Sequence, residues 1–261
     1  MRVVFVGKGG AGKSTLAGTF CRLLAEAGEC VIAFDGDEVP GLGQVLAADL
    51  GDQWSLAGVA ARTGEGGGWD LQLTPEEAVT RHAIEVRPRV RLLQFGKLSV
   101  GVITDAERSS LMAFHQIVGA YRDDGAWAVA DLPAGTLHAY TGWAGTVGVV
   151  LVVVQPSLKS LATAHRLVGL SHQHPHLRLA AVANQITSNA EREWLANELA
   201  DAGIPLWAVV PTDPAVTAAE RAGRPLAELD SDCPFVRDVA YLTEVLRKNV
   251  FQKKGVASPS G

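Results

Sequence analysis

The sequence is poor in cysteine and contains no paired cysteine motif. Its three cysteines, Cys21, Cys30 and Cys233, lie far apart and form no Cys-x-Cys or Cys-x-x-Cys pair. Disulfide scaffolds and thiolate metal sites both depend on denser or closely paired cysteines. We therefore expect reduced thiols, as in a cytoplasmic protein.

A hydrophobic run long enough to cross a membrane is also lacking. The longest apolar run, residues 147–154, has the length of a strand, whereas a membrane-spanning helix needs roughly 18 residues. The first residues enter a strand-like run at once, without the charged region, apolar region and cleavage site of a signal peptide. These observations predict a cytoplasmic protein without a leader.

Positive charge is in deficit. The chain has 23 Lys and Arg against 28 Asp and Glu, a formal net charge of −5. Proteins that bind nucleic acid broadly carry basic stripes, so the balance disfavours nucleic acid as a partner, although it leaves a local basic patch open. A hydrophobic content of 48% in 261 residues suits an ordinary globular domain with a sizeable core.

Apolar strand-like runs alternate with amphipathic runs along most of the chain, which predicts an α/β fold with a mostly parallel sheet covered on both faces. The expected strands are residues 3–6, 30–34, 69–73, 90–95, 127–130, 147–154, 177–183 and 206–210. The expected helices are residues 16–27, a short one from 74, then 104–121, 157–171, 191–202, 214–222 and 234–249. We expect a single domain over residues 1–251 and a disordered tail over 252–261.

The most informative stretch lies near the start of the chain. Residues 7–14 read G-x-x-x-x-G-K-S, between an apolar strand-like run and an amphipathic run. In that context glycines let backbone N–H groups surround a polyphosphate, Lys13 reaches the β- and γ-phosphates, and the Ser14 hydroxyl binds Mg²⁺. A glycine-rich turn with a chance lysine is the alternative, and the strand-to-helix context disfavours it. The candidate phosphate-binding residues are Gly9, Gly10, Ala11, Gly12, Lys13, Ser14 and Thr15.

One residue inside this loop narrows the interpretation. With Lys8, residues 8–15 read K-G-G-A-G-K-S-T, and here the sequence resembles the deviant-Walker (MinD/ParA-type) ATPases, which include the nitrogenase iron protein and the nickel-insertion ATPases. The resemblance implies a doubly wound P-loop fold and Mg²⁺-dependent ATP hydrolysis coupled to homodimer formation. It also implies that Lys8 is catalytic and reaches the nucleotide of the other subunit. By itself, Lys8 is a second cation near a phosphate site or a solvated loop lysine.

Two acidic residues at strand ends are candidate switch residues, because ligands of an open parallel sheet bind outside the carboxyl ends of its strands. Residues 35–37, Asp-Gly-Asp, resemble the family's Asp-x-Asp-Pro, which implies that Asp37 orients the attacking water and helps to hold Mg²⁺ through water. The alternative is an ordinary Asp-Gly turn. Glu38 stands where the family has proline, and Gly41 where Asn or Asp is common.

The second switch candidate is Asp131. Residues 131–136 match the family's Asp-x-x-x-Gly, which implies that Asp131 holds Mg²⁺ through water while the backbone near Gly135 senses the γ-phosphate. A turn without a functional role is the alternative.

The resemblance continues on the adenine side. Asn184 follows the strand of residues 177–183 and inherits the family's adenine contact, since an amide can both donate and accept. Pro211, Thr212 and Asp213 fit the family's adenine-side loop, Pro-x-Asp-Pro. Altogether the resemblance covers about two thirds of the chain and misses mainly residues 50–89 and 96–108.

Residues 153–160 look like the V-V-x-P-S-x-x-S segment of the nickel-insertion ATPases that mature carbon monoxide dehydrogenase (CooC-like). Those proteins carry Cys-x-Cys before a helix, whereas residues 96–103 here hold no cysteine. The implied function is an ATPase that drives maturation or regulation of a client protein, such as a metalloenzyme. The alternative is a MinD/ParA-like positioning ATPase with a membrane or nucleoid partner. GTP is a less favoured nucleotide than ATP, because the Asn-Lys-x-Asp motif that selects guanine is absent.

Two further features have competing interpretations. Residues 172–176, His-Gln-His-Pro-His, could bind a divalent metal, but we expect a solvated loop at the edge of the sheet far from the nucleotide. The amphipathic run of residues 235–251 ends in basic residues. We expect it to pack on the sheet, and a membrane anchor is the alternative.

Overall fold

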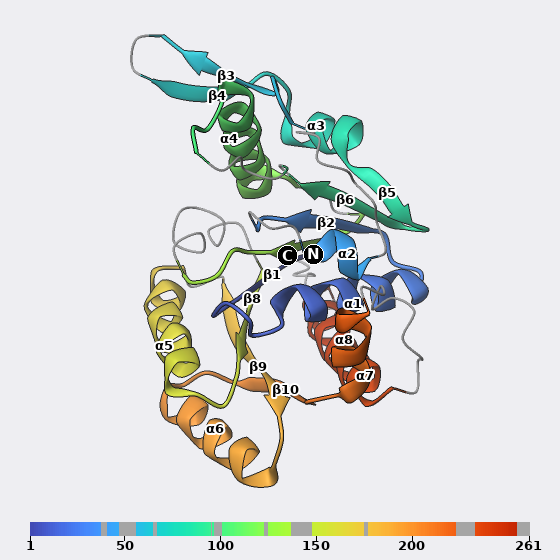
Figure 1. The fold of residues 1–261 in the computed structure, drawn as a ribbon, viewed down its shortest axis with the longest axis vertical. Helices are drawn as coiled ribbons and strands as arrows, with labels where there is room; N and C mark the ends of the chain where they lie inside the picture. Colours follow the sequence, from blue (N-terminus) through green and yellow to red (C-terminus); the bar gives the residue numbers. More distant parts are fainter. Residues whose placement is uncertain are drawn as a thin grey trace, which may run out of the picture.

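The computed structural model describes residues 1–37, 41–46, 56–64, 67–94, 96, 101–122, 125–136, 148–174, 177–222 and 233–254. Its centre is an eight-stranded sheet of order β10-β9-β8-β1-β7-β2-β6-β5 (Figure 1). The strands are β1 (Arg2–Gly7), β2 (Val31–Asp35), β5 (Ile84–Arg87), β6 (Val90–Gln94), β7 (Trp127–Asp131), β8 (Val149–Val154), β9 (Arg178–Ile186) and β10 (Leu206–Pro211). All neighbours pair in parallel except β5 with β6. The predicted doubly wound, mostly parallel α/β fold is confirmed.

Alternate residues of each strand face opposite sides of the sheet, and each side carries its own core. Val3 and Phe5 of β1 pack in one core with α1 (Lys13–Glu26) and α8 (Pro234–Lys254). Val4 and Val6 pack in the other with α4 (Asp105–Ala120), α5 (Leu158–Gln173) and α6 (Asn189–Asp201) (Figure 1). Every residue of β8 is buried, which explains its nearly continuous apolar sequence.

The predicted helix starts at Thr74 and Thr104 are confirmed. The side chain of each threonine accepts a hydrogen bond from the backbone N–H three residues later. In turn, the carboxylate of Glu77 or Glu107 accepts a hydrogen bond from the backbone N–H of the threonine. These two capping boxes begin α3 (Pro75–His82) and α4.

Three short elements were not predicted: α2 (Leu42–Val45), β3 (Ala60–Thr63) and β5. Three of the four β3 residues are exposed, and β5 has no buried residue, so neither strand shows the apolar pattern by which a strand is recognised. β3 pairs antiparallel with β4 (Gly68–Leu71), in a hairpin separate from the main sheet (Figure 1).

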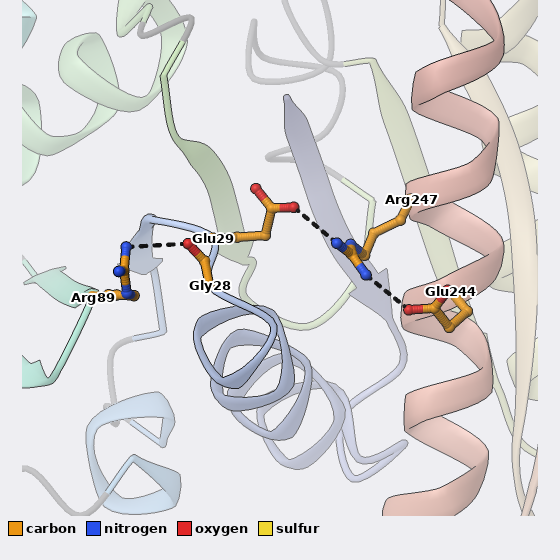
Figure 2. Close-up of polar contacts among 5 residues, drawn as sticks. All are labelled: Gly28, Glu29, Arg89, Glu244 and Arg247. Carbon is orange, nitrogen blue, oxygen red and sulfur yellow. Dashed lines mark hydrogen bonds and ion pairs between the residues drawn. The ribbon is translucent and has the colours of Figure 1, made fainter.

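Helix α8 packs on the sheet, as predicted. Its residues Phe235, Val239, Leu242 and Leu246 are at most 3% exposed, so this apolar face belongs to the core. Near the other end of the helix, Arg247 bonds to Glu244 (3.0 Å) and to Glu29 (3.3 Å), which follows α1 (Figure 2).

The helix continues to Lys254, beyond the predicted domain end at residue 251. Residues 255–261, the rest of the predicted tail, lie outside the described residues. None of the helices that the structure describes is both long and apolar enough to cross a membrane.

Candidate nucleotide-binding site

The loop of residues 7–14 joins β1 to α1, and two of its glycines are required by close contacts. Gly7 has φ +154° and Gly12 has φ +87°. A Cβ on Gly7 would lie 2.6 Å from the Val153 carbonyl oxygen, and one on Gly12 would overlap Nδ2 of Asn184. Larger residues at either position would push the loop away from β8 and β9. The loop is therefore packed closely against the carboxyl ends of these strands.

Beside the loop lies a cavity of about 670 Å³, a size typical of small-molecule sites. The predicted residues that line it are Gly9, Gly10, Gly12, Lys13, Ser14, Thr15, Asp37, Asn184, Pro211, Thr212 and Asp213. The structure thus places the phosphate loop and the predicted adenine-side residues around one cavity. Ala11, within the loop, is fully buried and does not line the cavity. Lys8 and Asp131 are likewise not among the described residues that line it.

Asp131, at the end of β7, lies beneath the loop. Its carboxylate is fully buried, and neither oxygen has a hydrogen-bond partner among the described residues. Burial raises the pKa of Asp131 to about 6, although the Ser14 hydroxyl and the Lys13 ammonium act in the opposite direction. A buried carboxylate without a partner is costly, which suggests that a positive ligand completes this site.

Asp35 was not predicted as a site residue. It is the register partner of Asp131 on β2 and is also fully buried. Its carboxylate accepts hydrogen bonds from the N–H of Leu42 (2.9 Å) and of Asp37 (3.3 Å). Burial, and next the charge of Asp131, raise the pKa of Asp35 to about 8. Through these two hydrogen bonds Asp35 positions the backbone of Asp37 and the start of α2.

These residues fit a magnesium ion. Asp131 offers two unpartnered oxygens next to Ser14, and Asp37 lines the adjacent cavity. Carboxylate and hydroxyl oxygens, with waters, are the ligands Mg²⁺ prefers.

In the described part of the chain, no group of three or more His, Cys, Asp or Glu side chains could hold a metal. His176 of the predicted histidine cluster lies outside the described residues.

Asn184 contacts the loop directly. It is 4% exposed, and its Nδ2 donates to the carbonyl oxygen of Ala11 at 2.8 Å. An amide nitrogen carries two protons, so one remains for a ligand in the cavity that Asn184 also lines.

Besides its predicted place in the adenine-side loop, Asp213 stabilises the fold through hydrogen bonds. Its Oδ1 accepts from Ala215 N–H (2.8 Å), and its Oδ2 accepts from Phe235 N–H (3.1 Å) and Cys233 S–H (2.8 Å). Burial raises the pKa of Asp213, but the bonds from Cys233, Phe235 and Ala215 outweigh it and leave the pKa lowered. Asp213 thereby joins the start of α7 (Pro214–Arg221) to the start of α8 and shapes one cavity wall.

Three more polar residues of the site were not predicted. Glu220 of α7 lines the cavity and accepts a hydrogen bond from Thr15 at 3.3 Å. Gln155 and Gln185 both donate to the carbonyl oxygen of Gly10. The spacing of Val216, Thr217 and Glu220, which share one face of α7, is the one local signal that could have indicated Glu220.

Residues 3–226 match the family described as the CobQ/CobB/MinD/ParA nucleotide binding domain. The chain belongs to this family. It is 26% identical to the carbon monoxide dehydrogenase accessory protein CooC of Rhodospirillum rubrum, over 98% of this chain and 100% of that protein. The family confirms the predicted resemblance, and the chain is a P-loop ATPase of the MinD/ParA type.

Solved structures share the fold. MinD of Pyrococcus horikoshii, complexed with Mg-ADP, superposes with a TM-score of 0.66 and 19% identity, covering 97% of this chain and 98% of that one. A chain of the MinC:MinD cell division protein complex of Aquifex aeolicus gives a TM-score of 0.62 with 18% identity, covering 100% of this chain and 98% of that one.

Proposed function

We propose that this chain binds Mg-ATP in the cavity, forms a homodimer in that state, and hydrolyses ATP slowly to control a client protein. The observation that carries the proposal is the unpartnered, buried Asp131 beneath a loop that presents Lys13 and Ser14. A bound Mg²⁺ would supply charge neutralisation between β- and γ-phosphates, held by Ser14 and, through water, by Asp37 and Asp131.

The cavity wall suggests how the nucleotide lies. Phosphates would occupy the loop end, where backbone N–H groups and the start of α1 favour anions. The base would lie between Asn184 and the loop of Pro211 and Thr212. Asp37, half-buried at the cavity rim, would accept a hydrogen bond from the water that attacks the γ-phosphate.

Lys8 would act on the nucleotide of a second subunit. In the described structure it is not one of the residues that line its own cavity, although it belongs to the same loop. A lysine from the partner would stabilise charge on the transferred phosphoryl group, as cations do in other P-loop enzymes. ATP binding, dimerisation and hydrolysis would then depend on one another.

The client is proposed by class. Similarity to CooC over nearly the whole of both chains favours a client of the metalloenzyme class, whose maturation the ATPase cycle would support. The alternative, positioning on a membrane through α8, is disfavoured because the apolar face of α8 is buried through Leu246. A pull-down in ATP and in ADP tests the client: a partner retained only in one nucleotide state is expected.

The Lys8→Ala variant tests the dimer mechanism. We expect loss of ATP-dependent dimerisation, measured by light scattering, and loss of phosphate release, with ADP affinity kept within about twofold. Lys248→Ala, which removes an exposed lysine of α8, is the control and should behave as the wild type. Unchanged hydrolysis by Lys8→Ala would refute the cross-dimer role.

A further inference from the structure

Two glutamines from different strand ends hold one carbonyl group of the phosphate loop. Gln155 follows β8 and Gln185 lies near the end of β9. Nε2 of Gln155 donates to Gly10 O (3.2 Å) and to Oε1 of Gln185 (2.5 Å), and Nε2 of Gln185 donates to the same Gly10 O (3.2 Å). We call this pair, Gln155 and Gln185, the glutamine clamp.

The clamp is a closed arrangement of donors and acceptors. It uses both protons of the Gln155 amide and both lone pairs of the Gly10 oxygen. Turning the Gln185 amide around would place its oxygen against Gly10 O, and turning that of Gln155 would place its oxygen against Oε1 of Gln185. Each glutamine therefore fixes the orientation of the other.

Both glutamines are held by their own surroundings. Gln185 has φ +59°, a left-handed conformation that is uncommon for a residue with a Cβ. The backbone N–H of Gln155 donates to Oγ of Ser160 (3.0 Å), a residue that is fully buried. The clamp thus depends on backbone positions that the end of β9 and the start of α5 keep in place.

The contact on Gly10 bears on Lys8. Because a peptide unit is planar and trans, fixing the carbonyl of Gly10 also fixes the direction of the Ala11 N–H. That N–H donates to Lys8 O at 3.2 Å and closes the turn of residues 8–11. The clamp therefore stabilises the turn that carries Lys8.

Asn184 acts on the next peptide unit and offers a contrast. It holds the carbonyl of Ala11 and so sets the direction of the Gly12 N–H. Gly12 lines the cavity, where backbone N–H groups would meet phosphate. Gly10 and Gln185 line this cavity too, so the contrast lies in what each held carbonyl sets: Asn184 sets the Gly12 N–H, whereas the glutamines set the Ala11 N–H that closes the turn of Lys8.

We propose that Gln155 and Gln185 are positioning residues for Lys8. They support ATP-driven dimerisation and turnover and contribute little to nucleotide binding by one subunit. The inference rests on the proposed function of Lys8 and adds to it the residues that hold its turn.

The test compares Gln155→Ala, Gln185→Ala and the double variant with the wild type. We expect each single change to lower kcat for ATP hydrolysis about 5- to 20-fold, the effect of losing one or two hydrogen bonds. The double variant should lose little more, because the two side chains act as one unit. The ADP Kd from calorimetry should stay within about twofold.

Gln72→Ala is the matched control. Nε2 of Gln72 also donates to a backbone carbonyl, that of Asp70 (3.1 Å), but at the exposed β3–β4 hairpin. It should leave kcat and ADP affinity unchanged. Gln185→Met keeps the length of the side chain and adds no charge to the phosphate site while removing the donor to Gly10, and it should show the same selective loss of kcat with an unchanged melting temperature.

The outcomes separate the two proposals. A wild-type protein that hydrolyses no ATP, or a fully active Lys8→Ala variant, refutes the proposed function itself. If Lys8→Ala is inactive while the clamp variants keep wild-type turnover, the clamp inference is overturned. It is also overturned if ADP affinity falls in parallel with kcat, since the glutamines would then shape the phosphate site as a whole.

Discussion

Asp35 and Asp131 are register partners on neighbouring strands, and both carboxylates are fully buried on the face of the sheet that α1 covers. Two carboxylates in one buried site cannot both ionise without cost, so the folded protein retains protons there. The pKa of Asp131 is raised to about 6 and that of Asp35 to about 8. Between pH 4 and these values the folded chain binds more protons than the unfolded chain, so the nucleotide-free protein loses stability as the pH rises.

The variant Asp131→Asn tests this cost. It removes a buried charge while keeping the size of the side chain. At pH 8 and without nucleotide or Mg²⁺, we expect it to be more stable than the wild type by roughly 1–3 kcal/mol. At pH 5 the difference should shrink, because Asp131 is then protonated in the folded wild type. Urea unfolding at both pH values measures the effect, and lower stability than the wild type at pH 8 would contradict it.

The same variant should lose hydrolysis, because an uncharged amide holds the Mg²⁺ ion and its bound water less strongly than a carboxylate does. A variant that is more stable but less active is expected where a side chain destabilises the fold and is needed at the functional site.

A second prediction concerns two helical glycines. A Cβ on Gly18 of α1 would overlap Cγ1 of Val45 in α2, whereas one on Gly119 of α4 would meet nothing within 4 Å. We expect Gly18→Ala to lower the free energy of unfolding by about 1–3 kcal/mol through overpacking. Gly119→Ala should instead raise it by up to about 1 kcal/mol, because alanine favours helix. Chemical denaturation of both variants measures this, and equal effects would show that α2 does not constrain α1.

The strands of the parallel sheet were predictable, because burial on both faces gives them continuous apolar sequences. β8 is the clearest case, with six buried residues. The phosphate loop was predictable because its residues are consecutive. β3 and β5 were missed because they lack a buried face. The contacts of Gln155 and Gln185 with Gly10 join residues 145 and 175 positions apart, and no local pattern indicates them.

Asp213 supports a third prediction. Because it accepts three hydrogen bonds that join α7 and α8, Asp213→Ala should lower the free energy of unfolding by about 2–3 kcal/mol. Its lowered pKa means that its contribution is present above the usual aspartate pKa and is lost as the pH falls below it. Thermal unfolding at pH 7 and at pH 3 measures the effect. Cys233→Ser, which keeps a donor for Asp213, is the control and should cost much less.

The cysteines allow a fourth prediction. Cys30 is exposed, while Cys21 and Cys233 are buried and free. Burial, with the nearby charge of Asp131, raises the pKa of Cys21, and burial together with Asp213 raises that of Cys233. Because only an accessible thiolate reacts readily, a maleimide should modify Cys30 within minutes in the native protein and the other two only on unfolding.

Peptide mapping by mass spectrometry identifies the modified thiol, and Cys30→Ser should remove the fast reaction. Rapid labelling of Cys233 in the native protein would show that the start of α8 opens, and with it the cavity wall that Asp213 builds. The slow labelling of Cys233 that follows unfolding should become slower still when ATP is added, because a nucleotide bound between Asn184 and residues 211–213 would hold that wall closed. If ATP left the rate unchanged, the adenine side of the proposed site would have to be sought elsewhere.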